Sequence, residues 1–113
     1  MTRLEALKGL WIDVEAGDLE NPEFSILVSR PLMQCKASEA YRGSLDAAKV
    51  LHEEFLPDYV WEIRDWGFAC VWTRSIHDYG PHEGYSDESP ARAWLIAIIK
   101  ALAEMEMKNE RTD

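Results

Sequence analysis

Two short runs in the second half of the chain most restrict its fold. Residues 59–64 and 68–74 show the period-two patterning of β-strands, and Asp65-Trp66-Gly67 separates them. A short connection that contains glycine favours an antiparallel hairpin. Residues 82–86 offer a third, edge strand as an open alternative. Because so small a sheet is not stable alone, helices must cover one of its faces.

The patterns in the first part of the chain predict helices. Thr2 and Glu5 have the spacing of a capping box ahead of an apolar stripe, and Gly17 is a natural end for this helix. A second, short helix is expected from Asn21-Pro22 until Pro31 ends it. A strand over residues 24–29 is the competing interpretation. The segment 33–43 has no clear period and is expected to be a connection.

Two further helices flank the predicted hairpin. Ser44 caps the third helix, and Ser89-Pro90 opens the last one. The predicted fold class is therefore α+β: a small antiparallel sheet covered by helices, in the order α-α-α-β-β-(β)-α. The expected buried faces are Leu45, Ala48, Leu51 and Phe55 in the third helix, and Ala91, Trp94, Leu95, Ile98, Ile99, Leu102 and Met105 in the last.

Charge and cysteine content limit the possible partners and compartments. The 113 residues carry 12 Lys and Arg against 21 Asp and Glu, a formal net charge of −9. This balance disfavours direct binding to nucleic acids and adsorption to anionic membranes. No apolar run approaches the roughly 20 residues that span a bilayer, and no signal-peptide pattern begins the sequence. We expect a cytoplasmic protein in which Cys35 and Cys70 are buried free thiols.

Two helix starts resemble those of a known family. Residues 41–48, Tyr-Arg-Gly-Ser-Leu-Asp-Ala-Ala, resemble the Y-x-x-S-L-D-A-A helix start of the phage ABA sandwich domain family, which are small bacteriophage and prophage proteins. Residues 89–95, Ser-Pro-Ala-Arg-Ala-Trp-Leu, are similar to the T-P-A-x-A-L start of its last helix. The resemblance covers about residues 41–102 and implies no enzymatic activity, so no site residues are carried over from the family.

The chain departs from that family in two places. Trp94, Ile98 and Ile99 replace smaller residues, and the segment Tyr79–Glu88 is longer than usual. With this resemblance, the single domain divides into an N-terminal helical part (1–32), a family-like unit (41–105) and a charged tail (108–113) that is expected to fray.

No catalytic motif stands out. The glycines form no phosphate-binding loop, and Ser44 and Ser89 are explained as helix caps. A Cys–His pair of Cys70 with His52 or His82 is conceivable, but Cys70 fits a strand position in the core better. The loop from His77 to Glu83, with Asp78 and His82, holds the only plausible cluster of metal ligands. It supports a rival hypothesis, a small metal-dependent hydrolase, whereas the preferred interpretation has no catalytic residue, metal or cofactor.

The five tryptophans are unusual in a chain of this length. Trp11 and Trp94 fit helical core stripes, and Trp61 and Trp72 are expected on one face of the sheet. Trp66 lies in the predicted turn and has no such explanation. Either it folds back over the core or it forms an aromatic contact patch whose members are Trp66, Tyr79 and Tyr85.

Two acidic stretches, 13–23 and 78–88, contain no Lys or Arg. They keep a small protein soluble, or they imitate nucleic acid and block a host defence or DNA-binding enzyme. The second hypothesis needs the acids on one face of the molecule. The acidic residues concerned are Asp13, Glu15, Asp18, Glu20, Glu23, Asp78, Glu83, Asp87 and Glu88.

The sequence thus favours a non-enzymatic phage or prophage accessory protein in the bacterial cytoplasm. It would act through contacts with a host or phage protein. The amphipathic last helix and the spare aromatic residues suit a homodimer as well as a monomer.

Overall fold

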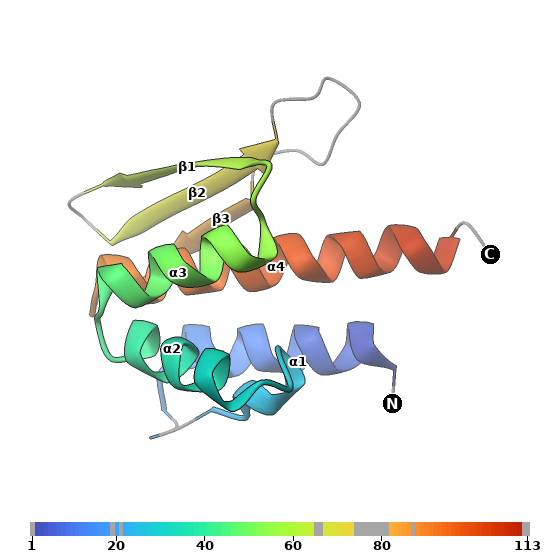
Figure 1. Ribbon diagram of the computed structural model, residues 1–113, viewed down its shortest axis with the longest axis horizontal. Helices are drawn as coiled ribbons and strands as arrows, with labels where there is room; N and C mark the ends of the chain where they lie inside the picture. Colours follow the sequence, from blue (N-terminus) through green and yellow to red (C-terminus); the bar gives the residue numbers. More distant parts are fainter. Residues whose placement is uncertain are drawn as a thin grey trace.

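The computed structural model describes residues 2–18, 20, 22–64, 67–73, 82–86 and 88–111. These residues form four α-helices and a three-stranded antiparallel sheet, which confirms the α+β class and the order α-α-α-β-β-β-α (Figure 1). The elements are α1 (Arg3–Ala16), the 3₁₀ helix η1 (Phe24–Ile26), α2 (Pro31–Tyr41), α3 (Leu45–Phe55), β1 (Tyr59–Arg64), β2 (Phe68–Thr73), β3 (His82–Tyr85) and α4 (Pro90–Arg111).

Helix α1 has the ends that the sequence predicts. The Thr2 hydroxyl accepts a hydrogen bond from the backbone N–H of Glu5 at 3.2 Å. Gly17 ends the helix in the left-handed conformation, with φ of 68°, which costs glycine little. The buried side of α1 is formed by Leu7, Leu10 and Val14.

The segment before α3 differs from the prediction. The helix expected from Asn21-Pro22 to Pro31 is reduced to η1, and Pro31 begins a helix instead of ending one. The fixed φ of proline and its missing N–H suit the first position of a helix. Residues 33–43, expected as a connection, lie largely in α2. The buried side of α2 contains Ala37 and Ala40, whose small side chains give little periodic signal.

Helix α3 begins at its predicted cap, and its buried face differs in part from the predicted one. The Ser44 hydroxyl accepts a hydrogen bond from the backbone N–H of Ala47 at 3.1 Å. Leu45 is 46% exposed, so the expectation that it is buried is wrong. Ala48 and Leu51 are buried as predicted, Phe55 is partly buried, and Ala47 and His52 complete the buried face.

The sheet has the order β1-β2-β3, which confirms the third strand. Three residues connect β1 to β2, so that Arg64 pairs with Phe68, and Trp61 pairs with Val71. Trp72 pairs with Val60, and side chains of neighbouring positions point to opposite faces. The expectation that Trp61 and Trp72 share one face is therefore wrong.

The register divides the sheet into two faces. The inner face, which packs on α4, contains Ala69, Val71, His82 and Gly84. We call the opposite side the outer sheet face, and its residues are Val60, Glu62, Arg64, Phe68, Cys70, Trp72, Glu83 and Tyr85.

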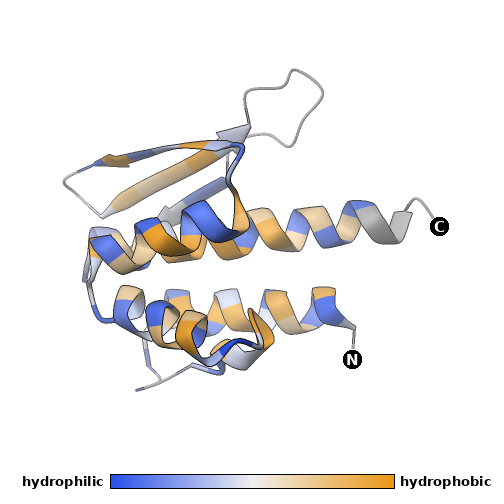
Figure 2. Cartoon of the chain, viewed as in Figure 1, coloured by the Kyte–Doolittle hydropathy of each residue, from blue (hydrophilic) through white to orange (hydrophobic). Residues whose placement is uncertain are grey.

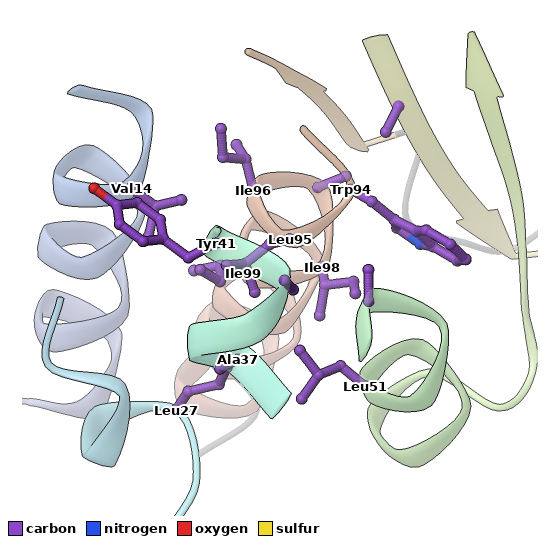
Figure 3. Close-up of a cluster of buried hydrophobic side chains, with 14 of the residues drawn as sticks. Val14, Leu27, Ala37, Tyr41, Leu51, Trp94, Leu95, Ile96, Ile98 and Ile99 are labelled. Atoms are coloured by element: carbon purple, nitrogen blue, oxygen red, sulfur yellow. The ribbon is translucent and has the colours of Figure 1, made fainter. Parts of the chain in front are cut away.

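Helix α4 lies at the centre of the molecule. It begins as predicted, since the Ser89 hydroxyl accepts a hydrogen bond from the backbone N–H of Arg92 at 3.0 Å. Every residue from Ala91 to Ile99 is buried, as expected for a helix that is surrounded by other elements. Figure 3 shows α1 on one side of α4, with α3 and the sheet on the other. Apolar residues colour much of α4 and β2 in Figure 2.

Strand β3 approaches α4 very closely at Gly84. A Cβ atom at this position would overlap the carbonyl oxygen of Ala93, and it would lie 2.9 Å from the backbone nitrogen of Ala97. Glycine on the strand and alanine on the helix thus allow backbone to pack against backbone. No helix within the described ranges is long and apolar enough to cross a membrane.

Candidate functional site

The outer sheet face carries an apolar middle strand. Phe68, Cys70 and Trp72 alternate along β2 with Ala69 and Val71, which belong to the buried core cluster. Phe68 and Cys70 do not belong to that cluster, although each is only 8% exposed. Figure 1 shows the helices on the other side of the sheet, and no described helix covers this face.

Aromatic and charged side chains from β1 and β3 lie across Phe68. The Tyr85 ring packs against the Phe68 ring at a centroid distance of 5.1 Å and an interplanar angle of 59°. On the other side, the Arg64 guanidinium lies 5.0 Å from the centre of the same ring. Tyr85 is 58% exposed, so this group combines a shielded phenyl ring with an accessible phenol.

Two carboxylates lie on the same face, one on each side of β2. Glu62 accepts a hydrogen bond from Arg64 Nε at 2.9 Å, and Glu83 accepts one from the Tyr85 hydroxyl at 3.0 Å. The hydrogen bond to Glu83 raises the pKa of Tyr85. Burial raises the pKa of the Cys70 thiol, and the negative charges of Glu83 and Glu62 raise it further. The thiol therefore stays protonated at neutral pH and is a poor nucleophile.

The structure describes only one of the three residues of the predicted aromatic patch. Tyr85 lies on the outer sheet face, whereas Trp66 and Tyr79 lie outside the described residues. The structure adds Phe68, and it adds Trp72, which was expected to share a face with Trp61. The signal that could have found them is the three-residue connection, because it fixes the register and so the side to which each strand residue points.

The structure also describes only part of the predicted metal-ligand loop. His77 and Asp78 fall outside the part of the chain that the structure describes. His82 and Glu83 lie on opposite faces of β3, since His82 is buried and Glu83 is exposed. Among the described residues, no group of three or more His, Cys, Asp or Glu side chains is arranged to hold a metal ion.

The two acidic stretches meet at the end of α1. Glu15 and Glu88 line one depression of about 220 Å³ together with Tyr85. Both carboxylates are paired with bases of α4: Lys100 Nζ lies 3.3 Å from Glu15, and an Arg92 nitrogen lies 2.7 Å from Glu88. These bases interrupt the acidic surface that a nucleic-acid mimic needs.

The remaining acids of the two stretches are not gathered in this depression. Asp18, Glu20 and Glu23 are exposed, Asp13 is partly exposed, and Glu83 lies on the outer sheet face. Asp78 and Asp87 lie outside the described residues.

No family model, curated protein or solved structure matches this chain. The resemblance to phage ABA sandwich proteins therefore stays a prediction.

A buried histidine joins α3, α4 and β1. The Trp94 indole N–H donates a hydrogen bond to His52 Nδ1 at 3.2 Å, so that Nε2 carries the proton and donates to the carbonyl of Tyr59 at 3.0 Å. Burial lowers the pKa of His52. Both ring nitrogens are occupied and the imidazole is neutral, so His52 has a structural role. No local pattern indicates this role, because Trp94 lies 42 residues from His52 in the chain.

The two thiols differ from each other. Cys70 is buried, but Cys35 is exposed on α2, so the expectation of burial is wrong for Cys35. The predicted Cys–His pair does not form with His82, because Cys70 points to the outer sheet face and His82 to the inner one. It does not form with His52 either, since that ring is fully hydrogen-bonded.

Proposed function

We propose that the protein is a non-enzymatic accessory protein that acts through protein–protein contacts at its outer sheet face. The composition of β2 carries this proposal. An antiparallel sheet with one face in water normally presents polar residues there. Here the middle strand presents Phe68, Cys70 and Trp72. Phe68 and Cys70 are already largely shielded, so the surface that a partner would remove from water is the partly exposed Trp72 and the exposed ring of Tyr85.

The surroundings of β2 support the proposal. Trp72, Tyr85 and Arg64 are of the residue types that most often dominate binding energy at interfaces. Glu62 and Glu83 lie around them, and a polar rim around an apolar centre is the usual anatomy of a protein interface. The expected partner has an apolar centre surrounded by charges of both signs.

We also propose that the chain is a phage or prophage protein of the bacterial cytoplasm. The two helix-start motifs at residues 41–48 and 89–95 support this origin. The partner would then be a host or phage protein, or a second copy of the chain.

Site-specific photo-crosslinking tests the contact surface. A benzophenone amino acid replaces Tyr85 on the outer sheet face or, as the matched control, Leu32 on α2, which is 66% exposed. After irradiation in bacterial cells, we expect one discrete crosslinked partner from position 85 and none from position 32. Irradiation of the purified protein shows whether that partner is a second copy.

Two further variants identify the part of the surface that matters. Trp72→Ser removes the indole from β2, and Arg64→Glu reverses an exposed charge while leaving the core untouched. Each should abolish the crosslink from position 85 while the protein still unfolds cooperatively. The proposal fails if position 85 yields no adduct, if positions 85 and 32 yield the same adducts, or if both variants leave the crosslink unchanged.

A further inference from the structure

A second feature lies away from the outer sheet face. A cavity of about 310 Å³ opens between α1, α4 and the inner side of β3, where Figure 1 shows α1 and α4 running side by side. Its walls include Leu4, Lys8, Trp11, His82, Glu104 and Met107. Small-molecule sites in proteins begin at about this volume and combine apolar walls with a few polar groups.

Among these residues, His82 gives the strongest indication that the cavity binds a ligand. Its side chain is 9% exposed, and Nε2 has no hydrogen-bond partner. The Glu104 Oε2 atom lies 3.3 Å from His82 Nε2 without forming a hydrogen bond, and Oε1 of the same carboxylate lies 3.8 Å from Lys108 Nζ. A buried polar atom without a partner is costly, and it is uncommon outside sites that receive a ligand or a water molecule. Burial lowers the pKa of His82, which keeps the ring neutral at pH 7.

The neutral ring of His82 and the carboxylate of Glu104 together favour a ligand group that donates hydrogen bonds. In the tautomer that carries its proton on Nδ1, His82 Nε2 is an acceptor, and the Glu104 carboxylate is a second acceptor beside it. An ammonium group has three N–H donors and one positive charge, so it satisfies both acceptors at once.

Positive charge lies on other parts of the same wall. Lys100 is held in place: its Nζ lies 3.3 Å from Glu15, donates to the Glu83 carbonyl at 3.0 Å and lies 5.4 Å from the centre of the Trp11 ring. Lys8 is exposed and has no ion pair with any residue that the structure describes. In a chain of net charge −9, this free ammonium is available to bind a carboxylate.

The rest of the wall is apolar. Leu4, Trp11 and Met107 are partly buried, and Ala103 is almost completely buried. This mainly apolar surface matches an aliphatic or aromatic side chain.

We propose that this cavity binds a free α-amino acid with an apolar side chain. The ammonium group of the ligand lies between His82 Nε2 and Glu104, its carboxylate lies beside Lys8, and its side chain packs on Leu4, Trp11 and Met107. The proposal is independent of the protein contacts at the outer sheet face.

Titration of the isotope-labelled protein followed by NMR tests the site. L-Leucine, L-methionine and L-phenylalanine are added, and the Trp11 indole N–H signal should shift in a saturable way with at least one of them. For L-leucine, the matched probes are 3-methylbutylamine, which lacks the carboxylate, and 4-methylpentanoate, which lacks the ammonium group. Each should bind at least about tenfold more weakly, because the amine leaves Lys8 without a carboxylate and the acid leaves His82 Nε2 without a donor.

Variants separate this site from adventitious binding. Lys8→Gln, at an exposed position that does not affect folding, should weaken amino-acid binding about fivefold or more. Lys8→Arg should restore most of it, and Lys49→Gln on α3 is the control that changes nothing. Ala103→Leu should block binding by filling the cavity. The proposal is overturned if no amino acid saturates the Trp11 shift by about 10 mM, if either probe binds as well as L-leucine, or if Lys8→Gln and Lys49→Gln behave alike.

Discussion

The two faces of β2 differ in the size of their side chains and in what lies against them. On the inner face, Ala69 and Val71 are fully buried against α4. On the outer sheet face, Phe68 and Trp72 are much larger, and these two residues and Cys70 lie outside the core cluster. Apolar character alone does not decide which face is buried. The close approach of α4 at Gly84 leaves space only for small residues there, and Ala69 pairs with Gly84. The large Phe68 and Trp72 of this strand point away from the core.

The largest expected effect comes from closing that narrow space. In Gly84→Ala, the new Cβ would overlap the carbonyl oxygen of Ala93, so we expect the free energy of unfolding to fall by about 3 kcal/mol. The control is Gly9→Ala in α1, where an added Cβ meets nothing within 4 Å. It should stabilise the protein by about 0.5–1 kcal/mol. Urea denaturation measures both, and equal stability of the two variants would show that the approach is not tight.

A polar atom introduced on each face of β2 should have a smaller effect that differs between the faces. Val71→Thr keeps the shape of the side chain but buries a hydroxyl in the core, which should cost about 2 kcal/mol. Cys70→Ser places a hydroxyl opposite Glu62 and Glu83, which accept hydrogen bonds, so the loss should stay below about 1 kcal/mol. If Cys70→Ser destabilises the protein as much as Val71→Thr, the two faces are equally buried and the comparison is wrong.

Lowering the pH should reduce the free energy of unfolding, because two buried histidines must take up protons. His52 and His82 both have pKa values lowered from 6.5, mainly by burial. The unfolded chain therefore takes up protons at a higher pH than the folded chain does. Their stabilising contribution is complete above pH 6.5 and is lost as the pH falls below it, at no more than about 1.4 kcal/mol per pH unit for each histidine.

Denaturant titrations between about pH 7.5 and pH 5.5 measure this loss before most carboxylates titrate. His82→Gln should flatten the dependence of stability on pH. An unfolding free energy that is constant or rises as the pH falls would contradict the assignment of both rings as neutral.

The smallest effect concerns the thiols and reports on the outer sheet face directly. Cys35 is exposed, whereas Cys70 is buried with a raised pKa. Iodoacetamide should therefore modify Cys35 about tenfold faster than Cys70 or more, as followed by mass spectrometry of the peptides. Cys35→Ser isolates the slow reaction. Equal rates at the two thiols would mean that Cys70 is accessible in the free protein.

The elements that were predicted correctly depend on chemistry within a few residues. Thr2, Ser44 and Ser89 each cap a helix through a hydrogen bond to a backbone N–H three residues later. The hairpin follows from period-two patterning around a short connection with Gly67, whose φ is 77°. Such signals are local, so one sequence is enough to interpret them.

The features that were missed depend on contacts between distant segments. Helix α2 is buried through alanines, which carry no strong periodic signal until α3 and α4 are placed beside them. The faces of β2 depend on the register and on how closely Gly84 packs against α4. The cavity brings Lys8, His82 and Glu104 together from α1, β3 and α4, and no spacing in the sequence indicates that they meet.

The central position of α4 has a consequence for how the protein is made. A ribosome synthesises α1, α2, α3 and the three strands before residues 90–111 emerge. Until then, α1 and the inner sides of β2 and β3 lack the helix on which they pack, and α2 and α3 have each other but not α4. The apolar sides of these elements are therefore incompletely covered until residues 90–111 emerge, and cooperative folding waits for α4. Chaperones that bind apolar segments would meet this protein on the ribosome, before it has a tertiary structure.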